Sequence, residues 1–291
     1  MKIVNILGGL GNQMFQYAFL VALREASGSE TCYDASVFKT YPWHNGFELD
    51  KLFTITARQA SVDEIKKLSL YTSDYRLWRV LNHLPQRKTR VSESTIKVFS
   101  PTLISDPGDY YYTGYWQDSR YFDRFKAIVR QEFTWKKPLD EKNMVLWKDL
   151  YSNPAISIHV RRGDYLKDWR YKGICGHDYY RKAINQALEL TTSDPIRFVV
   201  FSDDSLWCKD YIVPLLRGRS YTLVDWNTGE AASNDMRLMS ACQINIIANS
   251  SFSWWAAYLN EHPGSQIISP RRWTNADTTS IRQLEKWIQI D

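Results

Sequence analysis

The chain has 291 residues, a length that fits one large domain or two smaller ones, and its apolar content is ordinary for a globular protein. Its net charge of +5 is a mild basic excess, which favours anionic ligands without requiring nucleic acid. The sequence contains no block of like charge and no RNA- or DNA-binding motif, so nucleic-acid-binding proteins are excluded as a class.

The four cysteines lie far apart and lack the paired spacing of zinc or redox sites: Cys32, Cys175, Cys208 and Cys242. Reduced thiols are therefore expected, as is usual in the cytosol. Met1 leads directly into a predicted strand, and no apolar run has the length of a signal peptide or a membrane span. We expect a cytoplasmic protein that associates with the inner membrane, if at all, as a peripheral partner.

The first segment predicts a strand, a glycine loop and a helix. Residues 2–7 form the strand, Gly8–Gln13 the loop, and residues 14–26 a helix with an apolar stripe. Asn12 is the expected N-cap and Gly28 the expected stop. Such a loop can direct backbone N–H groups at an anion, although its spacing matches neither a P-loop nor a dinucleotide fingerprint. A plain strand-to-helix turn is the alternative.

Residues 31–135 have a less regular pattern, and we expect this region to shape the binding site of a second substrate. The predicted elements are a helix over 62–70 opened by a capping box of Ser61 and Glu64, an aromatic strand over 109–117, and helices over 119–132 and 138–153. We place the domain boundary after residue 152.

The stretch Ala155–Tyr165 begins as an apolar, β-branched run and ends in a group of charges. Its first half predicts a strand buried on both faces, as in parallel sheets, and Gly163 marks the turn where this strand stops. His159, Arg161 and Asp164 thus lie at or beyond the carboxyl end of the strand, where open α/β sheets bind ligands. The arginine pair at 161 and 162 indicates a phosphate, because a guanidinium matches its oxygens bidentately. A structural Arg–Asp pair is the alternative.

After this stretch, strands and helices alternate, which predicts a parallel, doubly wound domain over residues 153–291. Helices are expected over 178–190, with Asp178 as the cap, and over 234–243, 250–260 and 280–290; strands are expected over 196–201, 220–224, 244–248 and 266–269. The chain of the terminal helix, over 280–290, can cross back and pack on the first domain.

Polar clusters follow three of these strands: residues 159–164, 202–204 and 249–251. Topology alone brings them to one edge of the sheet. Ser250 and Ser251 also stand at a helix N-terminus, which favours phosphate. Asp235, in a first helical turn, can accept hydrogen bonds from guanine, but a surface aspartate favoured by the helix dipole is the alternative.

Two further groups of residues are candidates for a sugar or a metal site, and we expect neither to bind one. Trp254, Trp255 and Tyr258 follow a helical spacing and are expected in the core. The pair Asp203–Asp204 resembles the acidic pair that holds a divalent ion in some nucleotide-sugar enzymes. We nevertheless expect no metal and no other cofactor, because Arg161 and the helix start already supply positive potential for a diphosphate.

Three motifs now resemble one family, the bacterial α-1,2-fucosyltransferases, which are inverting, GDP-fucose-dependent enzymes with the GT-B fold. The motifs run from Gly8 to Ala18, from His159 to Tyr165 and from Asn249 to Leu259, in the family's order and separation. The middle motif is shared with α-1,6- and protein O-fucosyltransferases, so it indicates GDP-fucose rather than a linkage. The implied architecture is two Rossmann-like domains facing across a cleft, with the nucleotide on the C-terminal one.

The resemblance also implies residue roles. Arg161 would bind the β-phosphate and His159 would lie against the nucleotide. Asp235, sixteen positions before Ser251, corresponds to a guanine contact of the α-1,6 relatives. The other donor-binding positions are Gly11, Asn12, Gln13, Asn249, Ser250, Ser251 and Phe252, of which Asn12 would reach the pyrophosphate or the fucose.

The catalytic base does not carry over from the resemblance. In the α-1,6 relatives an acidic residue lies five positions after the motif's aspartate, and here that position is Trp169. Asp164 and Asp168 remain as candidate bases beside the catalytic Arg161.

The sequence therefore predicts a glycosyltransferase that moves L-fucose from GDP-β-L-fucose to the 2-hydroxyl of a terminal β-galactoside, free or on a glycolipid-linked glycan. Two alternatives remain open: a GT-B enzyme with another nucleotide-sugar donor, and a non-catalytic carbohydrate-binding protein whose aromatic side chains hold a glycan.

Overall fold

The structure, a computed structural model, describes residues 1–82, 84, 87–96, 98–191, 195–275, 284 and 286–291. The chain forms two compact units, Met1–Lys137 and Pro138–Asp291. The division falls before the helix α7 (Glu141–Ser152), whereas the sequence predicts a boundary after residue 152. No helix in these ranges is both long enough and apolar enough to cross a membrane.

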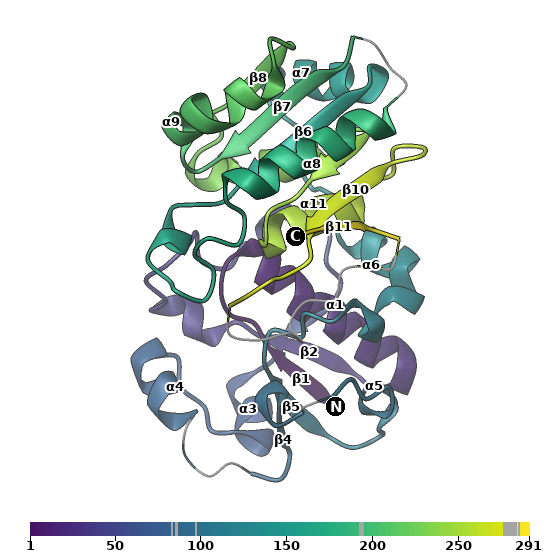
Figure 1. Ribbon diagram of the computed structural model, residues 1–291. Helices are drawn as coiled ribbons and strands as arrows, with labels where there is room; N and C mark the ends of the chain where they lie inside the picture. The colour runs from purple at the N-terminus through teal and green to yellow at the C-terminus, as the bar shows by residue number, and fades with distance from the viewer. Residues whose placement is uncertain (83, 85–86, 97, 192–194, 276–283, 285) are drawn as a thin grey trace. The chain divides into compact units, whose positions relative to one another are not determined.

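The first unit is built on a parallel five-stranded sheet (Figure 1). Its strands are β1 (Lys2–Asn5), β2 (Thr31–Asp34), β3 (Arg58–Gln59), β4 (Arg90–Ser92) and β5 (Tyr110–Thr113). Their order is β3-β2-β1-β5-β4, so the direction in which strands are added reverses at β1. A ligand site is therefore expected beyond the carboxyl ends of β1 and β5.

The helix α1 (Leu10–Ser27) is the central helix of this unit. Every residue from Gln13 to Leu23 is buried, so the predicted single apolar stripe understates its burial. Gly28 ends the helix in the left-handed region, as predicted, with φ of 65°. The predicted N-cap at Asn12 is wrong: the helix begins earlier, and the carbonyl of Gly9 accepts the N–H groups of Asn12 and Gln13 at 2.9 and 3.0 Å.

The other helices of the first unit are short: α2 (Leu49–Leu52), α3 (Val62–Leu68), α4 (Tyr75–Leu81), α5 (Thr102–Ser105) and α6 (Lys126–Glu132). The predicted capping box of α3 is confirmed, with Ser61 and Glu64 bonded reciprocally. The helix predicted over 119–132 is only partly correct, because two 3-10 turns precede α6.

The second unit contains a parallel six-stranded sheet. Its strands are β6 (Ala155–Val160), β7 (Arg197–Ser202), β8 (Tyr221–Val224), β9 (Ile244–Ile246), β10 (Gln266–Pro270) and β11 (Ile288–Ile290). The order β11-β10-β9-β6-β7-β8 is that of a doubly wound fold, and its switch point lies between β6 and β9. All six residues of β6 are buried, as predicted.

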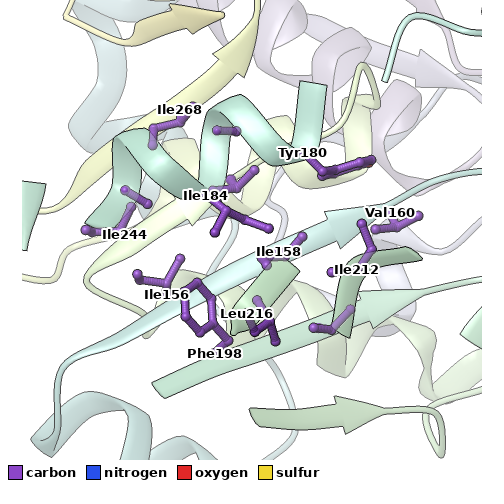
Figure 2. Packing of buried hydrophobic residues seen from close by; sticks show 14 of the residues in the cluster. Ile156, Ile158, Val160, Tyr180, Ile184, Phe198, Ile212, Leu216, Ile244 and Ile268 are labelled. Atoms are coloured by element: carbon purple, nitrogen blue, oxygen red, sulfur yellow. The ribbon is translucent and has the colours of Figure 1, made fainter. Parts of the chain in front are cut away.

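Helices cover this sheet: α8 (His177–Leu190), the short α9 (Ser205–Trp207), α10 (Ser233–Ser240) and α11 (Ser251–Leu259). Figure 2 shows Tyr180 and Ile184 of α8 packed with Ile156 and Ile158 of β6 in one apolar core. The predicted cap at Asp178 is wrong, since Gly176 is the N-cap and Asp178 lies in the first turn.

The prediction of a terminal helix over 280–290 is wrong for its last three residues. Ile288–Ile290 forms β11, which pairs in parallel with β10 from Ile268 to Pro270. Backbone pairing with the sheet thus overrides the helical spacing of the apolar residues here. Residues 280–283 and 285 of this prediction lie outside the described residues.

Candidate active site

The carboxyl ends of β6 and β9 bring two of the sequence motifs together. The ring centroids of His159, in β6, and Phe252, in α11, are 5.9 Å apart. The Tyr165 hydroxyl donates to the backbone oxygen of Asn249 at 3.1 Å. The site therefore lies at the switch point of the second sheet, where open α/β folds bind their ligands.

His159 is a neutral side chain within this site. It is 7% exposed, and within the described structure its Nδ1 atom is buried without a hydrogen-bond partner. Burial, assisted by the charge of Arg161, lowers the pKa of His159 to about 3. An unpaired buried nitrogen is costly, so this ring is suited to a hydrogen bond with a ligand rather than to charge pairing.

Arg161 follows β6 and is held by two carboxylates. Its Nη2 lies 2.9 Å from Oδ1 of Asp164, and its Nη1 lies 3.2 Å from Oδ2 of Asp203. The side chain is 32% exposed, and its guanidinium lies 5.7 Å from the ring centroid of Tyr165. Because both partners are themselves partly exposed, an entering phosphate can exchange with either of them at modest cost.

Asp203 and Asp204 form ion pairs with Arg161 and Arg162. Asp203 also accepts the backbone N–H of Arg162 at 2.8 Å, while Asp204 accepts from Nε of Arg162 at 3.0 Å. The Oδ2 atom of Asp203 lies 2.9 Å from where a Cβ on Gly163 would stand, so glycine permits this close approach. Within the described residues, no group of three or more His, Cys, Asp or Glu side chains is placed to hold a metal.

The two candidate bases are both engaged with arginines. Asp168 binds Arg170 through Nε, at 3.0 and 3.1 Å, and through Nη2, at 2.5 Å. The hydrogen bonds from Arg170 hold the pKa of Asp168 below its ordinary value, which weakens it as a base. Asp164 is 55% exposed and bonds Arg161, a predicted ligand of the diphosphate.

The start of α11 is arranged for an anion, although its residues differ in role. The Oγ atom of Ser250, the N-cap, accepts the N–H of Phe252 at 3.3 Å. Ser251 opens the helix, whose N-terminal dipole favours phosphate. The Asn249 side chain is buried and donates to the carbonyl of Trp273 at 3.0 Å, which is a structural contact. Trp254, Trp255 and Tyr258 are buried in the core, as predicted.

Asp235, in the first turn of α10, has one hydrogen-bond partner among the described side chains. Nδ2 of Asn227 donates to its Oδ1 at 2.7 Å. Burial raises the pKa of Asp235 to about 7. Within the described part of the chain its second oxygen accepts no hydrogen bond and no cation pairs with it, so this half-buried carboxyl is suited to accept N–H groups from a ligand such as a base edge.

A network of amides fixes the orientation of Asn227. The Asn143 side chain, in α7, donates to Oδ2 of Asp140 at 2.6 Å and accepts from Nε1 of Trp226 at 3.0 Å. Because a carboxylate only accepts and an indole only donates, the Asn143 amide has one orientation. Asn143 donates to and accepts from Asn227 at 2.8 and 3.0 Å, which turns the Asn227 NH₂ group toward Asp235.

The predicted residues of the glycine loop lie in the first unit and differ in exposure. The Gln13 side chain is fully buried and bonds the backbone of Gly8, Gly46 and Glu48 at 2.8 to 2.9 Å, so its polar atoms are used within the protein. Gly11 is buried in α1. Asn12 is half-buried, and its Oδ1 accepts from Nε2 of Gln117 at 2.7 Å.

Three residues that the sequence did not indicate support these sites: Gln117 and Glu93 beside the glycine loop, and Asn227 beside Asp235. Glu93 lies next to β4, and its Oε2 accepts the N–H of Tyr115 at 2.6 Å, which fixes the loop that carries Gln117. None of the three belongs to a motif. Their signal is spatial: Gln117 bonds Asn12 and Glu93 bonds Tyr115, while Asn227 is oriented by Asn143, 84 positions away.

Comparisons with known proteins extend over the whole chain. The family described as "Glycosyl transferase family 11" matches residues 1–291. An alpha-1,2-colitosyltransferase of Escherichia coli is 33% identical, covering 99% of this chain and 98% of that protein. Galactoside alpha-(1,2)-fucosyltransferase 2 of Bos taurus is 27% identical, covering 99% and 78%.

Solved structures confirm the predicted GT-B fold class. The crystal structure of NodZ alpha-1,6-fucosyltransferase soaked with GDP-fucose has a TM-score of 0.54 at 16% identity, covering 89% of this chain and 92% of that chain. A mutant of Arabidopsis thaliana FUT1 in complex with GDP has a TM-score of 0.51 at 13% identity, covering 100% and 76%. At such identities the similarity concerns the fold alone.

Proposed function

Because the chain belongs to glycosyl transferase family 11, we propose that it is a galactoside α-1,2-fucosyltransferase. It transfers L-fucose from GDP-β-L-fucose to the 2-hydroxyl of a terminal galactose, with inversion at the anomeric carbon. The observation that carries the proposal is the grouping of His159, Arg161 and the start of α11 at the switch point of the second sheet. The names of the relatives support it, since both of those given above are alpha-1,2 transferases.

The donor's charges are met by fixed groups of the second unit. Arg161 and the N-terminus of α11 bind the diphosphate, and they stabilise the negative charge that grows as GDP leaves. The neutral His159 lies against the nucleotide, and Asp235 accepts hydrogen bonds from guanine. The role of Asn12 toward the pyrophosphate or the fucose stays a prediction.

The reaction is a single displacement at the anomeric carbon. The galactose 2-oxygen attacks this carbon, its proton passes to a carboxylate, and the bond from the carbon to the β-phosphate oxygen breaks with both electrons leaving on GDP. Asp164 is favoured over Asp168 as the base. When the diphosphate takes Arg161, Asp164 loses its partner, whereas Asp168 stays bonded to Arg170.

We propose that no metal takes part. The support comes from Asp203 and Asp204, which bond Arg161 and Arg162 and so are not available as an open acidic pair. Equal turnover with EDTA and with added Mg²⁺ or Mn²⁺ is the expected result. A requirement for either ion would contradict the proposal.

A colitosyl donor is the second candidate, because the relative at 33% identity carries that name. Colitose is fucose without its 3-hydroxyl, so the two sugars present the same anomeric centre and the same leaving GDP. The choice depends on whether the site bonds the 3-hydroxyl, since a site built for a hydroxyl rejects the analogue that lacks it.

The deciding experiment incubates the protein with GDP-fucose, GDP-colitose, GDP-mannose and UDP-sugars in turn, with a panel of β-galactosides as acceptors. We expect an α-1,2-fucosylated product, identified by NMR. Transfer from GDP-colitose alone would show that GDP-colitose, and not GDP-fucose, is the donor. Glycan binding without affinity for GDP and without turnover would favour a carbohydrate-binding protein and refute the proposal.

Two variants link this activity to the site. Arg161→Ala should lower kcat/KM for GDP-fucose by roughly 100-fold or more, as the loss of an oxyanion-stabilising group does. Arg181→Ala is the matched control, because Arg181 is an exposed arginine of α8 that pairs with the exposed Asp178. A cytoplasmic location, with or without peripheral attachment to the inner membrane, stays a prediction that cell fractionation tests.

A further inference from the structure

Three aromatic rings of the first unit meet on its surface although the chain separates them. Tyr41 and Trp43 lie in the loop after β2, and Tyr75 opens α4. The ring centroids are 5.4 Å apart for Tyr41 and Trp43, 4.9 Å for Tyr41 and Tyr75, and 5.3 Å for Trp43 and Tyr75, all close to edge-to-face. Trp43 is 49% exposed. We call these three residues the aromatic platform.

The platform borders the glycine loop that follows β1. The ring of Tyr41 lies 6.2 Å from that of His44, whose Nδ1 is 3.2 Å from where a Cβ on Gly9 would stand. Tyr115, beyond the carboxyl end of β5, is 43% exposed, and its Cε1 is 3.4 Å from the corresponding point on Gly8. The platform thus lies beside the carboxyl end of β1, where the order of the first sheet reverses.

The loop that carries Trp43 is anchored to the buried helix α1. Gln13 donates to the carbonyls of Gly8 and Gly46 at 2.9 and 2.8 Å and accepts the N–H of Glu48 at 2.9 Å. Three bonds from one fully buried side chain hold the loop to the glycine turn. An exposed aromatic surface that is fixed in this way loses little conformational entropy on binding.

The chemistry of this surface suits a sugar. A pyranose has an apolar face of C–H groups and a rim of hydroxyls, so it needs both an aromatic face and amide groups. The exposed ring of Trp43 supplies the first, and Gln117, whose Nε2 lies 2.7 Å from Oδ1 of Asn12, supplies an amide at the same edge of the sheet.

We infer that the aromatic platform binds the terminal galactose of the acceptor, with Trp43 against the apolar face of the sugar. This inference rests on the proposed function, because it assigns the acceptor of that reaction to a site. It also names residues within the irregular region 31–135, which the sequence could assign to a second substrate only as a whole.

The test measures acceptor kinetics with GDP-fucose at saturation for the wild type, Trp43→Ala and Trp43→Phe. Loss of the indole should raise the KM of the galactoside by roughly 3- to 10-fold, and phenylalanine should restore part of the loss. Leu77→Ala is the control, since Leu77 is 48% exposed in α4 and lies about 200° around the helix from Tyr75. Affinity for GDP-fucose, measured by calorimetry without acceptor, should stay unchanged in all variants.

The outcomes separate the two proposals. If the wild type transfers fucose and Trp43→Ala keeps its acceptor KM, the platform is not the acceptor site and the proposed function stands. If Trp43→Ala instead weakens the affinity for GDP-fucose, the ring stacks on the nucleotide and the inference is overturned. Absence of transfer by the wild type would refute the function itself.

Discussion

Replacing Asp235 with asparagine tests the guanine site most directly. The carboxylate of Asp235 can accept two N–H groups of guanine, whereas an amide can accept only one and opposes the second with its own NH₂ group. Loss of a charge-assisted hydrogen bond and the mismatch together cost about 2–4 kcal/mol, which is a roughly 30- to 1000-fold weaker affinity for GDP-fucose. Calorimetry without acceptor measures this affinity.

The pH dependence of the same affinity supplies an internal check. Burial raises the pKa of Asp235 to about 7, and the accepting form is the ionised one. Below pH 7 the free protein must therefore release a proton to bind guanine, so affinity should fall by up to about tenfold per pH unit, while above pH 7 it should level off. Asp140, the other carboxyl of the network, has a pKa held below its ordinary value by Asn143 and contributes no titration there.

GDP-fucose is the correct probe, because its diphosphate is esterified at both ends and does not titrate near neutral pH as GDP does. Asp235→Asn should bind equally weakly at pH 6 and pH 8. The reasoning is refuted if the wild type shows no pH dependence, or if the variant binds as tightly as the wild type.

Three further changes have expected outcomes. Asn227→Ala should reduce the preference for GDP over inosine diphosphate, which lacks the 2-amino group, by about fivefold; an unchanged ratio would show that Asp235 needs no positioning. Asp164→Asn should lower kcat by about 10²- to 10⁴-fold and Asp168→Asn by less than about tenfold, and the reverse ranking would make Asp168 the base. Glu132→Ala removes the buried partner of Tyr17, Thr56 and Arg24 and should cost about 3–5 kcal/mol, seen as a Tm roughly 10 °C lower. Burial alone would raise the pKa of Glu132, but the hydrogen bonds from Thr56, Tyr17 and Arg24 hold this pKa below its ordinary value. Its contribution to stability is therefore present above the ordinary glutamate pKa and is lost as the pH falls through the folded value. The Tm difference between the wild type and Glu132→Ala should shrink in acid.

Much of the second unit could be predicted because its signals are local. The apolar run of β6 marks a strand buried on both faces, and parallel pairing then places every following turn at the same edge. Contacts between His159 and Phe252 follow from that topology rather than from any property of either residue. The capping box at Ser61 succeeded for the same reason, since all its atoms lie within one turn.

The two helix ends that the sequence misplaced have different causes. Asn12 is a good N-cap residue, but the helix already begins at Leu10 and the carbonyl of Gly9 accepts the N–H groups of Asn12 and Gln13, so Asn12 lies within the first turn. Ile288 and Ile290 have helical spacing to earlier apolar residues, yet the exposed edge of β10 pairs with them as a strand. Propensity is a weak prior, and tertiary pairing overrides it at the C-terminal position.

Residues of the site that act through others left no trace in the sequence. Asp203 resembles half of an acidic metal pair, and only the structure shows that it bonds Arg161 and the backbone of Arg162. Asn143 and Asn227 are 84 positions apart, and nothing in either segment indicates that their amides meet. Such pairings depend on how α7 packs against α10, which no local pattern encodes.

The placement of Asn143 has a practical consequence for dividing this protein. The helix α7 precedes the first strand of the six-stranded sheet, and a fragment cut at residue 153 would keep all six strands of that sheet. It would nevertheless lack the amide that turns Asn227 toward Asp235, and with it the indole contact of Trp226. Chimeras that exchange the second unit between relatives should therefore be joined ahead of Asp140, so that Asp235 keeps the contact between Asn143 and Asn227 that orients its partner.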